Sequence, residues 1–401
     1  MNVTIKKCHL NGKISAPPSK SYCHRYLIAS MLSKSQCIVE NVYLSEDIQT
    51  TLNCLKELGC SISFVNNQIT LSPLLPNSQN HLLDCHESGS TLRFLIPIAL
   101  TMFDKVEFTG TKRLMERGIE IYEELLPKHG VVLTKDQHKI ILSGKLKAGD
   151  YVIPGDISSQ FITGLLFALP LLKGNSTITI IPPIKSIFYI HMTLNVLKQF
   201  KITYEFEGEK IKILGNQQYQ AVNCKVEGDY SNAAFLEAFN YFNHHIVLEG
   251  LNALNTQGDR VYQLYFNILN DYYAVLDISN AIDLGPVLFV FAALKHGATF
   301  TGTKRLKIKE SHRDQAIAEE LRKIGIKMKV EENKVKIYPS KIHAPVEPFE
   351  SHNDHRIVMA LSLISSFFDI KIKNASAINK SYPNYFDDLM KLGAEIDYEN
   401  E

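Results

Sequence analysis

The segment that decides the fold is Leu52-Asn53-Cys54-Leu55-Lys56-Glu57-Leu58-Gly59. Its apolar residues recur at the spacing of one helical face, and the glycine suits the left-handed residue that ends many helices. A short stretch of alternating apolar and polar residues follows, which is typical of a strand. Five more segments repeat this order of amphipathic helix, turn residue and strand: 123–130, 194–201, 264–271, 318–325 and 386–393.

The six turn positions are regularly spaced along the chain. Positions 59, 130, 201, 271, 325 and 393 are separated by 71, 71, 70, 54 and 68 residues. A second repeat agrees, because Phe-Thr-Gly-Thr-Lys-Arg-Leu occurs at 108–114 and again at 300–306. The sequence therefore predicts six copies of one α/β unit. Six units exceed one core, so we expect two domains of three units each, with the boundary near 224–229.

Composition excludes several classes of function. The chain has 401 residues, 43 Lys plus Arg and 42 Asp plus Glu, so its net charge is only +1. A general attraction to nucleic acid or to an acidic membrane is therefore not expected, and any cationic site must be local. The most apolar runs (161–172, 284–294 and 357–368) are too short to span a bilayer and predict buried helices.

Cysteine and histidine usage indicates a reduced protein without a metal. The seven cysteines are odd in number and form no C-x-x-C pair, and Met1-Asn2-Val3-Thr4 does not open a secretory signal. We therefore expect free thiols in the cytoplasm. The 14 histidines show no metal-ligand spacing, so we expect neither a metal nor a cofactor, and His244-His245 is interpreted as a surface pair.

The clearest candidate binding motif is Pro17-Pro18-Ser19-Lys20-Ser21-Tyr22-Cys23-His24-Arg25. The prolines prevent a helix before Ser19, and Ser19 or Ser21 can cap the helix that follows. Unpaired N–H groups and the positive end of the helix dipole lie there, together with Lys20. Arg25 is four residues beyond Ser21, hence on the same face. This combination predicts a site for a phosphate or carboxylate, although a simple capped helix fits the motif alone.

Other polar segments also precede apolar helices. Gly155 to Gln160 could be a second anion site or an ordinary cap, and Arg93, after the small loop 87–91, could equally contact a ligand or an internal carboxylate. Arg356 enters an apolar helix, where an Arg is costly unless it meets an anion. The cations at such positions, with two carboxylates that have apolar neighbours, predict a small, multiply anionic substrate. They are Lys20, Arg25, Arg117, Lys309, Arg313, Arg356 and Lys380, with Asp283 and Glu310.

These segments, in this order, resemble the 5-enolpyruvylshikimate-3-phosphate (EPSP) synthase family, whose members are 3-phosphoshikimate 1-carboxyvinyltransferases. The resemblance runs from about Ile14 to Phe386. Its most specific parts are Ser19-Lys20-Ser21 with Arg25, Ser158-Ser159-Gln160, Glu227-Gly228-Asp229, Glu310 with Arg313, Asn353-Asp354-His355-Arg356 and Lys380-Ser381-Tyr382-Pro383.

The resemblance implies a fold, α/β of the two-domain inside-out barrel type, with six βαβαββ repeats, three per domain, around buried parallel helices. It assigns residues 14–226 to the first domain and residues 1–13 plus 227–401 to the second, with the active site in the cleft between them. It also implies a monomer that acts in aromatic amino acid biosynthesis.

The resemblance further implies the reaction, in which the 5-hydroxyl of shikimate 3-phosphate attacks C2 of phosphoenolpyruvate and phosphate leaves. By motif position, shikimate 3-phosphate would be held by Lys20, Ser21, Arg25, Ser158, Ser159, Gln160, Ser186, Asp283 and Lys309. Phosphoenolpyruvate would be held by Lys20, Gly89, Arg117, Gln160, Arg313, Arg356 and Lys380. The expected catalytic residues are Asp283, as base for the 5-hydroxyl, and Glu310, Lys20 and Lys380, for the other proton transfers.

The chain departs from the family pattern at several positions. None of the changes removes a charged catalytic group, but they leave substrate affinity and sensitivity to the inhibitor glyphosate open. The changed residues are Glu87, Phe94, Gly118, Ile282, Arg305 and His312.

Two other functions are compatible with parts of this pattern. The sister transferase that acts on UDP-N-acetylglucosamine shares the fold but begins with Gly-Lys-Asn and typically carries a Cys, sometimes an Asp, in the loop before the Arg; here the motif is Ser-Lys-Ser, and 109–118 contains neither. A non-catalytic anion-binding homologue would be expected to lose Asp283, Glu310 or Lys380, and all three are present.

Overall fold

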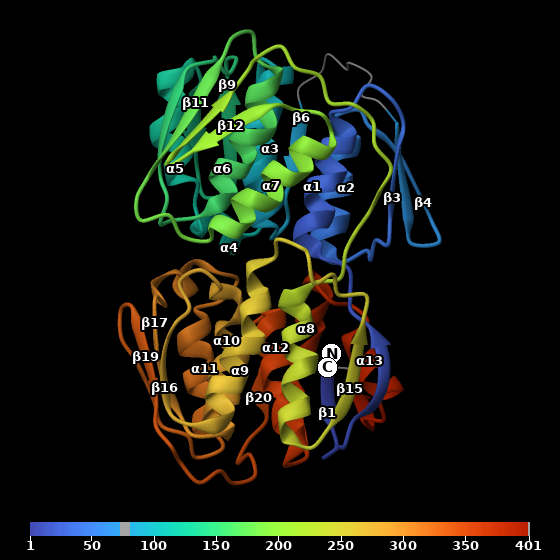
Figure 1. Cartoon of the computed structure of the whole chain (residues 1–401), viewed down its shortest axis with the longest axis vertical. Coiled ribbons are helices and arrows are strands. Elements are labelled where there is room, and N and C mark those ends of the chain that lie inside the picture. Colours follow the sequence, from blue (N-terminus) through green and yellow to red (C-terminus); the bar gives the residue numbers. More distant parts are fainter. Residues whose placement is uncertain (73–80, 400–401) are drawn as a thin grey trace. The chain divides into compact units, whose positions relative to one another are not determined.

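The computed structural model describes residues 1–72 and 81–399. These residues pack into two compact units, each drawn in Figure 1. The N-terminal unit is Lys20–Val226, and the C-terminal unit combines Met1–Ser19 with Glu227–Glu401. Each unit has its own hydrophobic core, so the prediction of a two-domain α/β fold is confirmed.

Three four-stranded sheets of one design make up the sheet part of the N-terminal unit. In each sheet the first two strands are parallel, and the other neighbours are antiparallel. A βαβαββ repeat produces this order, because a parallel pair needs a crossover whereas an antiparallel pair needs only a tight turn. In order of neighbours the sheets are β14 (Cys224–Lys225), β3 (Cys37–Glu40), β5 (Gln68–Ser72), β4 (Ser61–Val65); β6 (His81–Asp84), β7 (Lys105–Thr109), β9 (Lys139–Ser143), β8 (Val132–Lys135); and β10 (Asp150–Pro154), β11 (Ser176–Ile181), β13 (Lys210–Ile213), β12 (Tyr204–Glu207).

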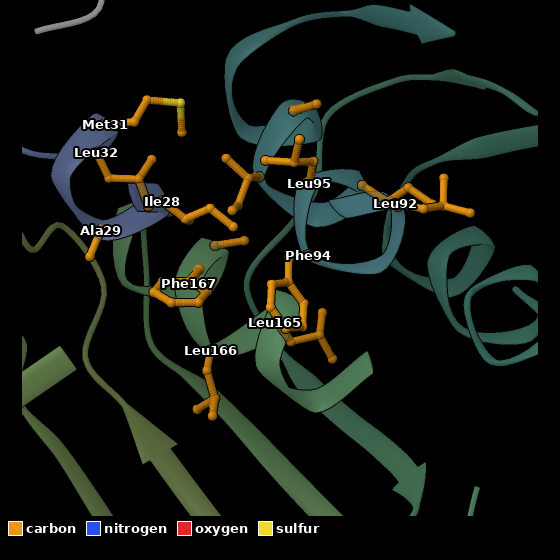
Figure 2. Packing of buried hydrophobic residues seen from close by; sticks show 14 of the residues in the cluster. Ile28, Ala29, Met31, Leu32, Leu92, Phe94, Leu95, Leu165, Leu166 and Phe167 are labelled. Carbon is orange, nitrogen blue, oxygen red and sulfur yellow. The ribbon is translucent and has the colours of Figure 1, made fainter. Parts of the chain in front are cut away.

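Three nearly fully buried helices form the centre of this unit. Figure 2 shows side chains from all three, among them Ile28, Phe94 and Phe167, gathered in the shared interior. The apolar run 161–172 is thus confirmed as a buried helix. The buried helices are α1 (Lys20–Met31), α3 (Gly89–Met102) and α6 (Ser159–Ala168), and the others are α2 (Glu46–Glu57), α4 (Lys112–Glu116), α5 (Glu120–Leu125) and α7 (Ile187–Gln199).

The C-terminal unit repeats the design twice and varies it once. Two sheets have four strands in the same order of parallel and antiparallel pairs, while among the described residues the third sheet has a single parallel pair. The sheets are β16 (Ala274–Asp277), β17 (Ala298–Thr301), β19 (Lys334–Ile337), β18 (Met328–Val330); β20 (Phe349–Glu350), β21 (Ile370–Lys373), β1 (Asn2–Ile5), β22 (Ile396–Glu399); and β15 (His245–Glu249) with β2 (Asn11–Ser15).

Its helices are again divided between a buried centre and an outer set. Nearly every residue of the central helices is buried, which confirms the apolar runs 284–294 and 357–368 as core helices. No helix among the described residues is both long and apolar enough to cross a membrane. The central helices are α8 (Tyr230–Glu237), α10 (Gly285–Leu294) and α12 (His355–Ser362), and the others are α9 (Tyr262–Asp271), α11 (Arg313–Arg322) and α13 (Tyr385–Lys391).

The predicted turn residues largely behave as expected. Gly59, Gly130, Gly325 and Gly393 all have φ between 85° and 106°, and Lys201 adopts the same left-handed region at 64°. These residues end a helix and turn the chain into the next strand. Their common conformation shows that the same helix-ending turn recurs in these units.

The turn expected at 271 is different. Helix α9 ends at Asp271, and Tyr272 is extended with φ of −160°. The next strand, β16, opens the following sheet instead of a hairpin within the same unit. The fourth unit therefore lacks its hairpin, which accounts for the short interval of 54 residues.

Two sequence expectations need correction. Residues 14–19 belong to the C-terminal unit, because β2 pairs with β15 and the Ser19 N–H donates to the Glu227 carbonyl (2.8 Å). His244 is buried: its Nδ1 accepts from the Leu10 N–H (2.8 Å), and its Nε2 lies 3.0 Å from Ser366 Oγ. Only His245 of that pair is exposed.

Candidate functional site

Helix α1 begins at Lys20, directly after the two prolines and Ser19, as predicted. Lys20 Nζ lies 2.8 Å from Asp47 Oδ2, and both side chains are about one-sixth exposed. Asp47 comes from the first turn of α2. This ion pair fixes the ammonium group at the start of α1, at the positive end of the helix dipole.

Arg25 is a buried cation, with only 2% of its surface exposed. Nη1 donates to the Ser21 carbonyl (2.7 Å), Nε to Thr193 Oγ1 (2.9 Å), and Nη2 to Thr163 Oγ1 (3.3 Å) and the Tyr189 carbonyl (3.2 Å). No carboxylate of the described part of the chain pairs with it. Burial lowers the pKa of Arg25 to about 10. The guanidinium is thus oriented by neutral partners, with its charge uncompensated.

The loop before α3 lies against Arg117. Ser88 caps the helix by accepting from the Thr91 N–H (3.3 Å). A Cβ built on Gly89 would lie 2.9 Å from Arg117 Nη2, so only glycine lets the guanidinium lie this close to the backbone. Arg117 Nη1 donates to the Glu87 carbonyl (3.3 Å), and the side chain is buried.

Arg93 proves to be an internal residue that orients two predicted site residues. Its Nη1 donates to Gln160 Oε1 (2.6 Å), and its Nη2 donates to the Arg117 carbonyl (2.9 Å). The amide nitrogen of Gln160 donates to Ser90 Oγ (2.9 Å), so both ends of the Gln160 amide are held and its orientation is fixed. The sequence left the partner of Arg93 open, and the partners are an amide and carbonyls.

The remaining predicted residues of this unit are serines at helix starts. Ser158 caps α6 by accepting from the Gln160 N–H (3.4 Å), and Ser159 is the first residue of that helix. Ser186 precedes α7 with φ of 55° and is buried. Both predicted anion motifs therefore do lie at helix starts.

Asp283 is the centre of a charged cluster in the C-terminal unit. Its Oδ1 lies 3.0 Å from Lys309 Nζ, 2.6 Å from Arg313 Nη1 and 3.7 Å from Arg356 Nε. Burial opposes ionisation of this carboxyl, but the three cations outweigh it and hold the pKa of Asp283 well below its usual range. The anion that Arg356 needs inside its apolar helix is thus supplied in part by this residue, whose carbonyl also accepts from Arg356 Nη1 (3.1 Å).

Arg313 contacts three carboxylates at once. Besides Asp283, Nη2 lies 2.5 Å from Glu310 Oε2, and Nε lies 2.8 Å from Asp354 Oδ2. Burial opposes the charge on Arg313, and the carboxylates overcome it, so the pKa of Arg313 is raised. Arg313 was expected to contact an anionic substrate, and in the structure protein carboxylates accept from its donors.

The start of α12 joins this cluster to Lys380. Asp354 caps α12 by accepting from the Arg356 N–H (2.9 Å). Burial opposes its ionisation, yet Arg313 lowers the pKa of Asp354 to about 2. Lys380 Nζ, which is buried, donates to the Asn353 carbonyl (2.6 Å).

Some charged residues near the predicted ones were not singled out from the sequence. Asp47 could not be recognised, because it lies 27 residues from Lys20 in an ordinary capped helix. Asp259 is buried, and burial together with the charge of Asp283 raises its pKa to about 6. The only signal for it was Gly258-Asp259 before a helical segment, which is common in turns.

The departures from the family pattern have local structural effects. The Phe94 ring lies 5.2 Å from the Arg25 guanidinium carbon, a cation–π contact that helps to hold this Arg. Gly118 has φ of 69°, which proline cannot adopt. Arg305 Nη2 donates to the Ser279 carbonyl, and Ile282 is buried in the core.

Comparison with known proteins identifies the family of this chain. The family model described as EPSP synthase (3-phosphoshikimate 1-carboxyvinyltransferase) matches residues 5–271 and 269–389. The chain is 38% identical to a protein of Clostridium kluyveri named 3-phosphoshikimate 1-carboxyvinyltransferase, over 98% of both chains. It is 35% identical to a protein of the same name from Brachyspira hyodysenteriae, over 99% of this chain and all of that one.

Solved structures show the same fold. Two structures of EPSP synthase from Acinetobacter baumannii match with TM-scores of 0.79 and 0.81, at 24% and 21% identity, and cover 99% and 100% of this chain. Alignment over the whole length, together with the family model, establishes the relationship. The chain belongs to the EPSP synthase family.

Proposed function

We propose that this protein transfers the enolpyruvyl group of phosphoenolpyruvate to the 5-hydroxyl of shikimate 3-phosphate and releases phosphate. Protonation of the methylene carbon of phosphoenolpyruvate and attack of the hydroxyl oxygen on C2 give a tetrahedral intermediate. Phosphate then leaves as a proton is lost from the new methyl group. Family membership supports this reaction, and so does the chemistry of two charged clusters, one in each unit.

In this proposal the N-terminal unit holds the phosphate of shikimate 3-phosphate. The observation that carries the proposal is Arg25, a buried guanidinium whose partners are all neutral, on the same helix as Lys20. A buried charge without a counter-ion is costly, and an anionic ligand would offset that cost. Ser21, Ser158, Ser159 and Ser186 would add hydroxyl or N–H donors at helix starts.

Phosphoenolpyruvate would take the cations that its phosphate and carboxylate require. Arg117 lies flat against Gly89, and Gln160 is held by Arg93, which leaves little freedom to either side chain. Arg313, Arg356 and Lys380 would contribute from the C-terminal unit. Neither unit alone carries the whole set, so we propose that both units act on one pair of substrates.

Asp283 would accept the proton of the 5-hydroxyl. Its low pKa in the free protein makes it a weak base, because three cations surround it. Bound phosphate and carboxylate groups would offset those cations and raise the pKa of Asp283 toward the value that proton transfer needs. Glu310, Lys20 and Lys380 would serve the proton transfers at the methylene carbon and at the departing phosphate.

A phosphate-release assay tests the proposal. Purified protein with shikimate 3-phosphate and phosphoenolpyruvate should release phosphate, and mass spectrometry should find a product heavier by the enolpyruvyl group. Replacement of shikimate 3-phosphate by UDP-N-acetylglucosamine should abolish release. Phosphate release with phosphoenolpyruvate and UDP-N-acetylglucosamine, but not with shikimate 3-phosphate, would favour the sister transferase. Substrate binding without any phosphate release would favour a non-catalytic homologue.

A further inference from the structure

The segment between β20 and α12 is a tight turn with an unusual backbone. The Asp354 N–H donates to the Ser351 carbonyl (3.0 Å), and the two central residues, His352 and Asn353, have φ of 51° and 53°. Two positive φ values in succession define a type I′ turn, for which glycine and asparagine are usual. A histidine at the first central position carries a conformational cost, so other contacts must stabilise it.

Helix α11 supplies those contacts at two places. Glu320, which is 2% exposed, accepts from the Glu350 N–H (2.8 Å) through Oε2, and its Oε1 lies 2.9 Å from His352 Nε2. Seven residues earlier on the same helix, Arg313 pairs with Asp354 at the other end of the turn. Seven residues are two helical turns, so both contacts come from one face of α11.

This turn also positions three residues of the proposed site. The Asn353 carbonyl accepts from Lys380 Nζ (2.6 Å), and Asp354 holds both Arg313 and the first turn of α12, from which Arg356 projects. A change in how the turn sits on α11 would therefore move these cations together.

We propose that His352 is a positioning residue for the enolpyruvyl transfer: in its protonated form it fastens the 351–354 turn to α11 through Glu320 and so holds Lys380, Arg313 and Arg356 in the geometry that binds phosphoenolpyruvate. This inference rests on the proposed function of those three cations. It assigns to His352 no contact with the substrate.

The charges around His352 favour the protonated ring. Glu320 and Glu319 of α11 lie 2.9 Å and 3.9 Å from Nε2, and Glu350 of β20 is nearby. Two cations oppose this: Lys323 of α11 pairs with Glu320 (2.8 Å), and Lys373 of β21 stands opposite Glu350 in the sheet. The hydrogen bond to Glu320 raises the pKa of His352, although burial opposes this. The charge-assisted contact is therefore fully present below the ordinary value of about 6.5 and weakens as pH rises through the higher folded pKa.

The experiment compares three single variants by steady-state kinetics across pH. H352N and H352G keep a residue that tolerates positive φ but cannot reach Glu320, so they remove the contact and leave the turn conformation accessible. H296N is the matched control, because His296 is an exposed histidine of the same unit whose Nε2 lies 3.1 Å from the Asn270 carbonyl oxygen. Circular dichroism checks folding.

Below pH 6.5 we expect H352N and H352G to raise KM for phosphoenolpyruvate about tenfold, as loss of one charge-assisted hydrogen bond would do. We expect kcat to change less, and H296N to match wild type. The ratio of variant to wild-type KM should fall as pH rises through the folded pKa of His352, because the wild type then loses the charge as well. A purely structural role would leave that ratio constant.

The results distinguish failure of the proposed site from failure of the role of His352. If K380M keeps wild-type kinetics, the site assignment fails and this inference fails with it. If K380M is impaired but H352N and H352G stay within twofold of wild type at every pH, only the role of His352 is overturned. If neither His352 variant folds, the wild-type protein decides: the His352 ring resonance must titrate above pH 6.5 with the same midpoint as KM, and a lower or unrelated midpoint refutes the proposal.

Discussion

Replacement of Asp354 by Asn should isolate the contribution of one buried ion pair to stability. Asparagine is as good an N-cap as aspartate and can still accept from the Arg356 N–H, so the start of α12 is preserved. What is lost is the charge that pairs with Arg313 through Nε (2.8 Å) and Nη2 (3.3 Å). Asp354 is fully buried, so solvent does not screen this pair.

The magnitude follows from the pKa of Asp354. A fall from the ordinary 3.8 to about 2 corresponds to about 2–3 kcal/mol of folding free energy at neutral pH. Removal of one partner of a buried pair often costs about 3–5 kcal/mol. We expect the lower range, because Asp283 and Glu310 still contact Arg313 in the variant.

The sign of the pH dependence is set by the direction of the shift. Because the folded pKa is lowered, the stabilisation is complete above pH 3.8 and is lost as pH falls through about 2. The free-energy difference between wild type and D354N should therefore be constant near neutrality and shrink between pH 4 and 2. Urea unfolding followed by circular dichroism measures this free-energy difference, and hydrogen exchange of α12 peptides measures the stability of the C-terminal unit separately.

Asp314 provides a matched control. It is adjacent to Arg313 and equally buried, but burial raises its pKa. D314N should therefore leave stability unchanged or increase it. The reasoning is refuted if D354N lies within about 0.5 kcal/mol of wild type at pH 7, a change typical of neutral surface substitutions, or if D314N loses as much as D354N.

Three further outcomes are expected. K20M should lower turnover by roughly 10²–10³-fold in the phosphate-release assay while thermal unfolding is unchanged, because it removes a fixed cation where charge develops; turnover within tenfold would exclude the role. D283A and E310A should each reduce kcat by about 10²–10⁴-fold with a smaller effect on either KM, and a defect confined to KM would contradict proton transfer. G118A should cost about 1–2 kcal/mol of stability, since φ is 69° there, and a variant as stable as wild type in thermal unfolding would argue against this backbone conformation.

The repeat could be predicted from the sequence because its signals are local. Four glycines and Lys201 at the helix ends adopt the left-handed conformation that the pattern implies, and the apolar runs become the buried helices. The missing hairpin of the fourth unit was visible only as a short interval. Its cause, a strand that joins the following sheet, depends on pairing between segments and not on any residue near 271.

The positions of several candidate residues at helix starts could be predicted from the sequence, but the contacts between them could not. Helix starts mark Lys20, Ser158 and Arg356, because capping residues and cations are recognisable in a few letters. The cluster around Arg313 could not be predicted, since two of its three carboxylate partners lie 30 and 41 residues away in the chain. Which charges meet depends on how helices pack.

The discontinuous C-terminal unit has a consequence for the order in which the protein can fold during synthesis. All of Lys20–Val226 is available once the third repeat has been translated. Strand β1, labelled in Figure 1, instead pairs with β21 and β22, with Asn2 opposite Glu399. At ribosomal rates of about 5–20 residues per second, the first strand made must wait roughly 10–35 s after the N-terminal unit is complete before its last neighbour emerges.

During that interval β2 can already pair with β15, which follows within about 25 residues of the boundary. This early pairing would hold the waiting β1 close to the place where its sheet will form, so that β1 can pair with β21 and β22 as soon as they emerge, before other nascent chains compete for this unpaired strand.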